Sequence, residues 1–272
     1  MYKAVFIDLD GTLLRKNHTV SDAAKEVLQK LIQKNVLVVL VSARPLHGIM
    51  HIAEKTGLER CPVASLNGAY IFNNGRIIYD AVIGNELVTQ VHQQLQKYES
   101  TPIYYHQNEW YSETKNAHTD HEQRITSIPV TIQPFAETCS VWQNKSSGPN
   151  KILVVANAKI IEEIQSGLKQ QYPNELTVCT SKPTFLEIMH ESASKLKAVK
   201  MISEYYHISQ EEIVAIGDNF NDMEMISFAG LGIAMGNAPD AVKEVANYVT
   251  DTNNNDGVAK ALERFFLNNE HL

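Results

Sequence analysis

One short stretch near the start of the chain constrains the fold more than any other: Val5-Phe6-Ile7-Asp8-Leu9-Asp10-Gly11-Thr12-Leu13. Its first half is apolar and β-prone, which predicts a buried strand. Gly11 ends that strand, because glycine can adopt unusual backbone angles. Side chains alternate along a strand with a period of two, so Asp8 and Asp10 are expected to point to the same side at its end. Two carboxylates are thus predicted to converge on one small space.

Two converging carboxylates repel each other and favour protonation of one of them, unless a hard cation lies between them. A divalent metal, most simply Mg²⁺, resolves that repulsion. With its charge partly cancelled, one aspartate can attack an electrophile while the other transfers protons. This pattern favours phosphoryl transfer through an aspartyl-phosphate. The alternative for so short a motif is a pair of aspartates that caps a surface turn.

Length and composition exclude several classes of protein. At 272 residues, with 44% apolar and 20% charged residues, the chain is long enough for two domains and shows no sign of disorder. The longest apolar run, Val36 to Val41, is far too short for a bilayer, so no membrane association is expected. The net charge of −7 argues against a nucleic-acid binder, which needs a basic face.

A reducing cytoplasm is the expected location. The chain passes directly from its first residues into the predicted strand, which leaves no room for a removable signal. Its three cysteines are scattered and make no evident disulfide framework: Cys61, Cys139 and Cys179.

Predicted helices and buried strands alternate after the first motif, as in a doubly wound α/β sheet. Ser21 can cap a first helix, and the run from Val36 to Val41 predicts a strand buried on both faces. Ser42 and Ala43 follow, just before a second helix. The Ser42 hydroxyl and the Ala43 amide are candidates to hold a phosphate oxygen there, and the alternative role of Ser42 is a helix cap. Asn67 ends a further strand and is interpreted mainly as a turn residue.

The alternation changes at about Ile83, where the short strands and helices of a separate α+β unit are expected. We therefore divide the chain into a first core segment 1–82, an inserted domain 83–186 and a second core segment 187–272. The aromatic residues of the inserted domain can line a substrate cleft or fill its core. The run His118-Thr119-Asp120-His121-Glu122 looks like a set of metal ligands, but it lacks a suitably spaced partner and is predicted as a solvated loop.

Chemically active residues return after residue 192. Lys195 stands at a predicted helix start, where the helix dipole disfavours a cation, so it is interpreted as a fixed charge for the nucleophile and the phosphoryl group. A buried strand at 213–217 ends in Asp218-Asn219-Phe220-Asn221-Asp222, which is either an acidic helix cap or the second corner of a metal site. The candidate metal ligands are Asp8, Asp10 through its backbone carbonyl, Asp218 and Asp222, the last also as support for the others.

These motifs together resemble those of the haloacid dehalogenase-like hydrolases, and their order and inserted unit resemble the Cof-type sugar-phosphatase branch of that family. The resemblance implies a mostly parallel, Rossmann-like α/β core with an inserted α+β cap domain that closes over the substrate. The motifs that carry it span both ends of the chain: Asp8-Leu9-Asp10-Gly11-Thr12, Ser42, Asn67-Gly68, Lys195, Gly217-Asp218-Asn219-Phe220-Asn221-Asp222, Ala234-Met235-Gly236-Asn237-Ala238 and Asp256-Gly257-Val258-Ala259.

The resemblance also implies the role of each residue. Asp8 is expected to be the nucleophile, Asp10 the acid and base, and Asp218 with Asp222 the completion of a Mg²⁺ site. The phosphoryl group is expected to be bound by Ser42, Ala43, Lys195 and Asn221. The expected activity is a Mg²⁺-dependent phosphatase acting on small phosphorylated metabolites such as sugar phosphates. The alternatives are a phosphomutase that uses the same intermediate, a phosphonate or halide hydrolase, and a non-catalytic metabolite-binding regulator. The sequence leaves the physiological substrate and the oligomeric state open.

Overall fold

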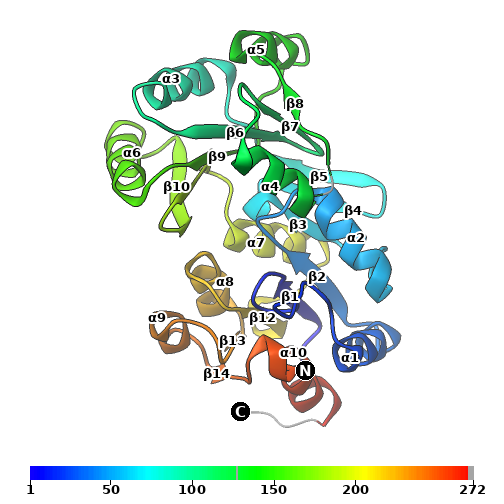
Figure 1. Cartoon of the computed structure of the whole chain (residues 1–272). Helices are drawn as coiled ribbons and strands as arrows, with labels where there is room; N and C mark the ends of the chain where they lie inside the picture. The colour runs from blue at the N-terminus through cyan, green and yellow to red at the C-terminus, as the bar shows by residue number, and fades with distance from the viewer. Residues whose placement is uncertain (127, 269–272) are drawn as a thin grey trace.

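The protein is built around two β-sheets, which the computed structural model describes over residues 1–126 and 128–268. The larger sheet has eight strands and lies mainly in the lower part of Figure 1, and the smaller sheet has six strands and lies in the upper part. The eight-stranded sheet contains segments from both ends of the chain, whereas the six-stranded sheet is formed entirely by the middle of the chain.

The eight-stranded sheet is parallel apart from an antiparallel hairpin at one edge. Its central strand comes from the start of the chain and pairs on both sides, so the carboxyl ends of three strands meet at one edge of the sheet. Across the sheet the order is β14 (Tyr248–Val249), β13 (Leu231–Ala234), β12 (Ile213–Gly217), β1 (Ala4–Asp8), β2 (Leu37–Val41), β3 (Val63–Ser65), β4 (Tyr70–Asn73) and β5 (Arg76–Asp80).

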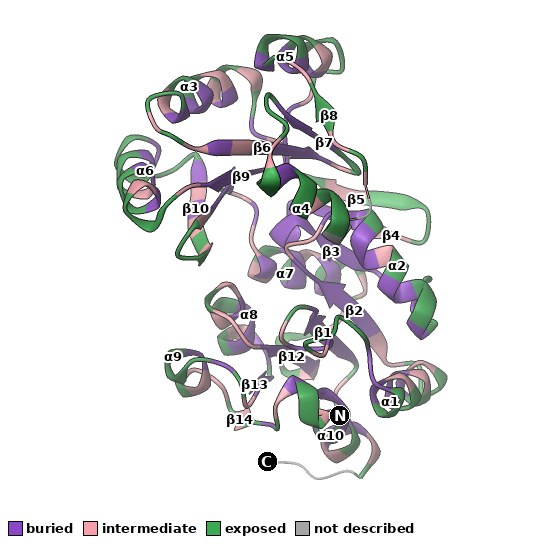
Figure 2. Ribbon diagram, in the orientation of Figure 1, coloured by how far each residue is buried: buried purple, intermediate pink, exposed green. Residues whose placement is uncertain are grey.

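Helices cover both faces of this sheet, so its central strands are mainly apolar and buried (Figure 2). One face packs against α1 (Asp22–Gln33), α2 (Leu46–Thr56), α10 (Gly257–Leu262) and the π-helical turn η5 (Glu263–Leu267). The other face packs against α7 (Lys195–Tyr205) and α8 (Met223–Phe228), and the short α9 (Asp240–Glu244) lies beside β13.

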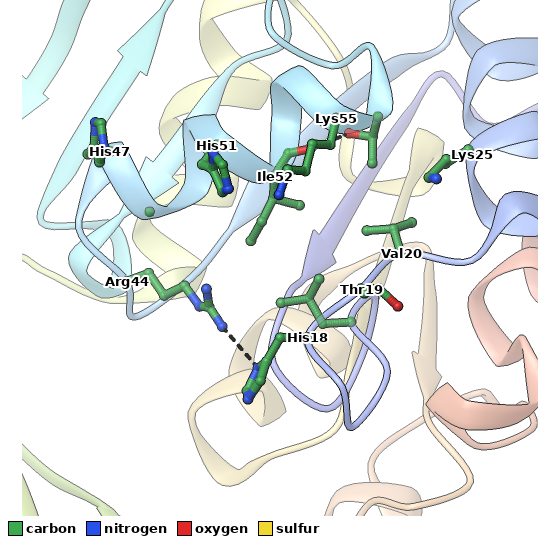
Figure 3. Close-up of a pocket in the computed structure, with 12 residues that line it drawn as sticks. His18, Thr19, Val20, Lys25, Arg44, His47, His51, Ile52 and Lys55 are labelled. Atoms are coloured by element: carbon green, nitrogen blue, oxygen red, sulfur yellow. Dashed lines mark hydrogen bonds between the residues drawn. The ribbon is translucent and has the colours of Figure 1, made fainter. Parts of the chain in front are cut away.

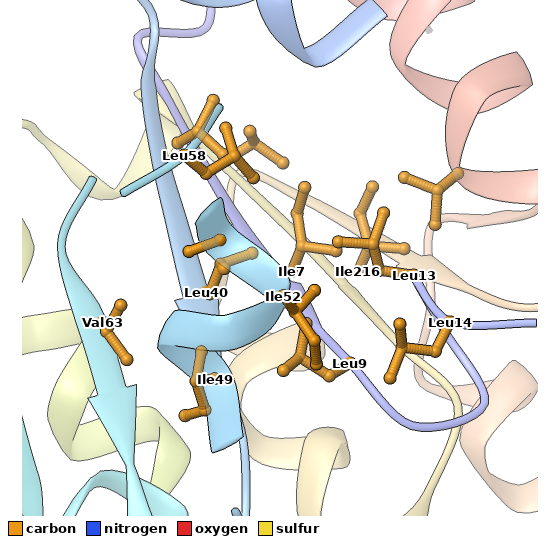
Figure 4. Close-up of a cluster of buried hydrophobic side chains, with 14 of the residues drawn as sticks. Ile7, Leu9, Leu13, Leu14, Leu40, Ile49, Ile52, Leu58, Val63 and Ile216 are labelled. Carbon is orange, nitrogen blue, oxygen red and sulfur yellow. The ribbon is translucent and has the colours of Figure 1, made fainter. Parts of the chain in front are cut away.

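Strand β1 shows how the sequence fixes this layering. Val5 and Ile7 point into the cluster beneath α1 and α2, whereas Ala4 and Phe6 point into the cluster beneath α7 and α8. All four side chains are fully buried. Figure 4 shows the first cluster, in which Ile7 lies among apolar side chains from neighbouring strands and from α2. The end of β1 is therefore held in a rigid place.

The six-stranded sheet is antiparallel except for one short parallel pair. One of its faces packs against α3 (Asn85–Leu95), α5 (Phe135–Asn144) and α6 (Ala158–Gln171). Its other face joins the main core cluster through Tyr105, Leu153 and Met189, so this face is turned toward the larger sheet. Across the sheet the order is β10 (Leu176–Lys182), β11 (Phe185–His190), β9 (Lys151–Val155), β6 (Thr101–His106), β7 (Glu109–Ser112) and β8 (Thr131–Ile132).

The predicted fold class, a doubly wound and mostly parallel α/β core with an inserted α+β unit, is confirmed. The division at residues 83 and 186 stays a prediction, and β11 continues past its second boundary to His190 within the six-stranded sheet. The predicted cap residue Ser21 does accept a hydrogen bond from the Ala24 N–H at the start of α1. Among the described helices, none has the length and the apolar character that crossing a bilayer requires.

The prediction of a loop at 118–122 is wrong, because these residues belong to the helix α4 (Ala117–Thr126). The side chain of Asn116 accepts hydrogen bonds from the N–H groups of His118 and Thr119, so an Asx cap starts the helix. The polar composition predicted solvent exposure, and His118, Asp120 and His121 are indeed exposed. The cap at Asn116 was the signal for a helix.

Candidate active site

The centre of the candidate site is Asp8, the last residue of β1. Its side chain is buried, and Lys195 at the start of α7 reaches it with 2.7 Å between Nζ and Oδ1. The same ammonium group donates to Asp222 Oδ1 at 2.6 Å. Two carboxylates thus offset the cost of a cation at a helix amino terminus. Among the described residues, Asp8 Oδ2 has no hydrogen-bond partner, so this oxygen is free to act on a ligand.

Three carboxylates form one cluster at this edge of the sheet. Ligand oxygens of Asp8, Asp218 and Asp222 all lie within 4.8 Å of one another. Burial raises the pKa of Asp8 well above its usual value, and the charges of Asp222 and Asp218 raise it further against the opposing effect of Lys195. Burial and the charge of Asp222 also raise the pKa of Asp218, to about 6. A set of oxygen donors that repel one another in this way suits a hard divalent cation, which removes the repulsion.

The surroundings of Lys195 favour its charged form, whereas those of Asp8 and Asp218 disfavour theirs. Burial alone would lower the pKa of this ammonium group, but the charges of Asp222 and Asp8 and their hydrogen bonds outweigh burial and raise it. Lys195 therefore remains a cation beside Asp8. Its position fits the predicted role of a fixed positive charge.

Asp218 is held by residues from both ends of the chain. Its Oδ1 accepts a hydrogen bond from the Thr12 hydroxyl at 3.1 Å, and its Oδ2 accepts one from Asn237 Nδ2 at 3.2 Å. Gly11 has a φ of +85°, and a Cβ atom there would collide with the Asp218 carboxylate. The first motif therefore needs glycine at this position both for its backbone angle and for the approach of Asp218.

Asp222 is fully buried and uses both of its oxygens within the protein. Oδ1 accepts from Lys195, and Oδ2 accepts from the backbone N–H groups of Asp218 and Asn219 at 3.0 and 2.9 Å. These contacts orient Lys195 and fix the turn that follows β12. The geometry thus favours the supporting role of Asp222 over that of a direct ligand.

Asp10 lies outside the carboxylate cluster. Its side chain is 49% exposed and forms a bidentate pair with Arg44, at 2.7 Å to Nε and 2.6 Å to Nη2. Burial alone would lower the pKa of Arg44, but the hydrogen bonds and the charge of Asp10 outweigh it and raise the pKa. The Asp10 side chain is therefore held by Arg44 and not by the carboxylate cluster.

The predicted phosphate-binding residues surround the same point. Ser42 is buried, and its hydroxyl accepts a hydrogen bond from the Arg44 N–H at 3.2 Å. Asn67 is also buried, and its Oδ1 accepts from Asn221 Nδ2 at 3.2 Å while its amide group donates to Glu187 in β11. The interpretation of Asn67 as mainly a turn residue is therefore incomplete, because its side chain joins the two sheets.

A cleft of about 490 Å³ lies between the two sheets and contains most of the predicted site residues. Asp218 and Asp222 do not line it, but each bonds to a residue that does, Asp218 to Asn237 and Asp222 to Lys195. The eight-stranded side of the cleft includes Asp8, Asp10, Ser42, Ala43, Lys195 and Asn221. The six-stranded side includes Tyr105, Glu122, Lys151, Ser181, Lys182, Phe185 and Glu187. The eight-stranded side of the cleft thus carries carboxylates and the Lys195 ammonium group, and the six-stranded side carries polar, charged and aromatic side chains.

Several residues of the cleft were not singled out from the sequence. Arg44 sits in the predicted run after β2, yet only the structure shows that it pairs with Asp10. Lys151 donates to the backbone oxygen of Ala43 at 2.7 Å and so ties the two units together. Neither residue has a local sequence signal, because each acts through a partner distant in the chain.

The comparisons with known proteins agree with this geometry. A family model described as haloacid dehalogenase-like hydrolase matches residues 5–262. A Haemophilus influenzae protein that is named provisionally as a phosphatase is 37% identical over 269 residues, which cover 98% of this chain and 99% of that protein. A Bacillus subtilis protein named 5-amino-6-(5-phospho-D-ribitylamino)uracil phosphatase YcsE is 30% identical over 268 residues, which cover 97% of this chain and 96% of that protein.

A solved structure shows the same architecture over nearly the whole chain. The crystal structure of a haloacid dehalogenase-like hydrolase from Bacteroides thetaiotaomicron superposes with a TM-score of 0.88 at 30% identity, covering 98% of this chain and 100% of that one. The resemblance inferred from the motifs is therefore confirmed. The chain belongs to the haloacid dehalogenase-like hydrolase family and is a phosphoric monoester hydrolase.

Proposed function

We propose that this protein is a Mg²⁺-dependent phosphatase that acts on small phosphorylated metabolites of the sugar-phosphate class through an aspartyl-phosphate at Asp8. The observation that carries the proposal is the position of Asp8 at the base of the cleft, with one oxygen bound to Lys195 and the other free of hydrogen bonds among the described residues. A carboxylate in this setting is an oriented nucleophile beside a fixed cation.

The donor set fits the proposed metal. Asp8, Asp218 and the backbone carbonyl of Asp10 would hold Mg²⁺, with Asp222 as support, because Asp222 already accepts hydrogen bonds at both oxygens. The bound ion would offset the negative charge that builds up between the carboxylate and the phosphoryl group.

The reaction proceeds in two displacements at phosphorus. Asp8 Oδ2 attacks the phosphorus atom, the bond to the ester oxygen breaks, and the departing alkoxide takes a proton from the Asp10 carboxyl group. A water molecule then gives its proton to Asp10 and attacks the same phosphorus atom, which breaks the bond to Asp8 and releases phosphate. Lys195, Ser42, the Ala43 amide and Asn221 hold the phosphoryl oxygens during both steps. Asp10 must leave at least one of its two contacts with Arg44 to do this work.

The side of the cleft formed by the six-stranded sheet and by α4 supports the sugar-phosphate class. It presents carboxylates and a hydroxyl at Glu122, Glu187 and Ser181, which can bind sugar hydroxyl groups. It also presents the half-buried ring of Phe185, which suits the apolar face of a sugar. The relative YcsE is named for a substrate that carries a phosphorylated ribityl chain, which is of the same chemical type.

The experiment that tests the proposal is a screen of phosphorylated metabolites with Mg²⁺ or with a chelator, ranked by kcat/KM. We expect phosphate release that requires Mg²⁺, with the highest values for sugar or polyol phosphates. Equal rates of phosphate release with Mg²⁺ and with the chelator would exclude a requirement for the metal. Formation of an isomer of the substrate without free phosphate would assign a phosphomutase instead.

A further inference from the structure

A second cavity lies beside the catalytic cleft and has a different chemical character (Figure 3). It measures about 560 Å³ and is formed between α2 and the segment that leads from β1 into α1. None of its twelve lining residues is acidic, although the chain as a whole carries a net charge of −7. Half of the lining residues are basic: His18, Lys25, Arg44, His47, His51 and Lys55.

The basic side chains come from separate segments that meet around one space. His51 and Lys55 follow each other at a spacing of four residues and so share one face of α2. Arg44 enters from the turn before α2, and Lys25 from α1, where it also pairs with the exposed Asp22 at 3.1 Å. Among the described residues, Lys55 has no ion-pair partner, so its charge is available to a ligand.

Gly48 keeps this cavity open. It lies inside α2, and a Cβ atom built there would meet only the Arg44 side chain, at 3.9 and 4.0 Å, which is ordinary van der Waals contact. Glycine in a helix interior is less favourable than alanine, so the helix loses stability at a position where alanine would fit. The consequence is an open space directly against the helix backbone.

Arg44 connects this cavity with the catalytic cleft, because it lines both. Its Nε and Nη2 donate to Asp10, and His18 Nδ1 lies 3.5 Å from Nη2, as the dashed line in Figure 3 shows. An anion in the second cavity would therefore compete with Asp10 for the guanidinium group.

We propose that this second cavity is a binding site for a diphosphate group, either free or as part of a nucleoside diphosphate. Cations that three separate segments bring to the cavity, Arg44, Lys25 and Lys55, suit two linked phosphates better than one (Figure 3). The apolar side chains of Leu14, Val20 and Ile52 in the same lining offer a surface to an organic part. Diphosphate binding in this cavity does not depend on the proposed function. Only the effect of the bound anion on Asp10 rests on that proposed function.

The test is an amide NMR titration of the whole protein in metal-free buffer with a chelator. The probes are methylenediphosphonate and the α,β-methylene analogue of ADP, neither of which can be hydrolysed between its two phosphorus atoms. We expect the largest shifts at the amides of Gly48, His51 and Lys55, together with the Arg44 Nε–H signal. Tighter binding of the first probe assigns a free diphosphate, and tighter binding of the second assigns a nucleoside diphosphate.

Matched variants make the test specific. Lys55→Ala is expected to weaken binding about fivefold, the size typical of one exposed charge pair. Lys30→Ala removes the same charge from an exposed part of α1 that does not line the cavity and is expected to leave the affinity unchanged. Gly48→Ala is expected to raise the melting temperature while it weakens binding, so a loss of binding through misfolding is recognised at once.

Three results would overturn the proposal. The first is the absence of amide shifts with both probes, and the second is equal affinity in Lys55→Ala and the unchanged protein. The third is a set of shifts confined to Asp8, Ser42 and Asp218, which would place the anion in the catalytic cleft. Failure of the proposed function would be seen in a different experiment. If Asp8→Asn retained turnover, the proposed function would be wrong, but the binding results would still stand.

Discussion

The two sides of the catalytic cleft are built differently. On the eight-stranded side the charged groups satisfy one another inside the protein, with Asp8, Lys195 and Asp222 at most 5% exposed. On the six-stranded side, Tyr105, Lys151 and Glu187 are buried as well, but towards the turn between β10 and β11 Lys182 is exposed and Ser181 and Phe185 are half-buried. Asp8, Lys195 and Asp222 thus hold one another in place on the first side, whereas the outer part of the second side presents side chains that can adapt to a ligand.

This difference assigns separate tasks to the two sides. A buried and interlocked set of charges can stabilise the same phosphoryl group in every substrate. An exposed wall contacts the rest of the substrate and so decides which phosphate esters enter. Substitutions on the eight-stranded side should therefore affect all substrates alike, and those on the six-stranded side should separate one substrate from another.

The largest expected effect is the loss of turnover in Asp8→Asn. The amide cannot attack phosphorus, so kcat for an aryl phosphate should fall by about 10⁴-fold or more. The measurement is the release of the phenol with Mg²⁺ present, and Asp240→Asn, at a side chain that is 96% exposed, is the matched control. Comparable loss in both variants, or none in either, would break the assignment of the nucleophile.

The next effect concerns stability. Lys195→Met leaves the buried carboxylates of Asp8 and Asp222 without their cation, so the free energy of unfolding should fall by about 3–5 kcal/mol. Denaturant titration of the metal-free protein measures it. A variant as stable as the unchanged protein would show that the eight-stranded side is not interlocked in the way described.

The pH dependence of metal binding gives a third test. The pKa of Asp218 is raised from 3.8 to about 6, so the folded metal-free protein binds this proton more tightly than the unfolded chain. Binding of this proton stabilises the folded protein fully at pH values below 3.8, the pKa in the unfolded chain. This stabilisation is lost as the pH rises through about 6. Mg²⁺ needs the ionised carboxylate, so its effect has the opposite sign.

We therefore expect Mg²⁺ at about 100 times its Kd to add about 2.7 kcal/mol at pH values well above 6, and much less at about pH 5. Scanning calorimetry with Mg²⁺ or with a chelator at the two pH values measures the difference. A stabilisation by Mg²⁺ that is the same at both would contradict the placement of the ion at Asp218.

The smallest effect should appear on the six-stranded side. Lys182 lines the cleft and is exposed, and its Nζ lies 5.0 Å from the centre of the Phe185 ring. Lys182→Ala should raise KM for the best sugar phosphate by up to about tenfold, while kcat for an aryl phosphate stays unchanged. The control is Lys145→Ala, an exposed lysine outside the cleft. An equal loss of activity toward the sugar phosphate and the aryl phosphate would contradict the proposed separation of tasks.

The sequence predicted the eight-stranded side of the cleft far better than the six-stranded side, for physical reasons. Asp8, Lys195 and Asp218 each follow a strongly apolar strand or begin a clear helix, so local patterns predict their places at one edge of a parallel sheet. Lys151 and Glu187 lie within strands of the six-stranded sheet, and their role arises from contacts to Ala43 and Asn67. No local pattern encodes such a contact.

Two misjudged positions show the same limit. The position of Asn67 after a strand predicts a turn residue, and its αL backbone agrees. Its contact with Asn221 and Glu187 needs the second sheet to be in place. Asp10 lines the same cleft as Asp8, but its side chain lies outside the carboxylate cluster because Arg44 binds it, and that contact has no local signal in the sequence.

The most direct test of the central claim is to mix the protein with a phosphate ester and Mg²⁺, quench in acid within the first turnovers, and map the phosphorylated peptide by mass spectrometry. We expect a phosphoryl group on Asp8, and none in Asp8→Asn. A full turnover with no phosphoryl group on Asp8, or with the group on another residue, would contradict the account.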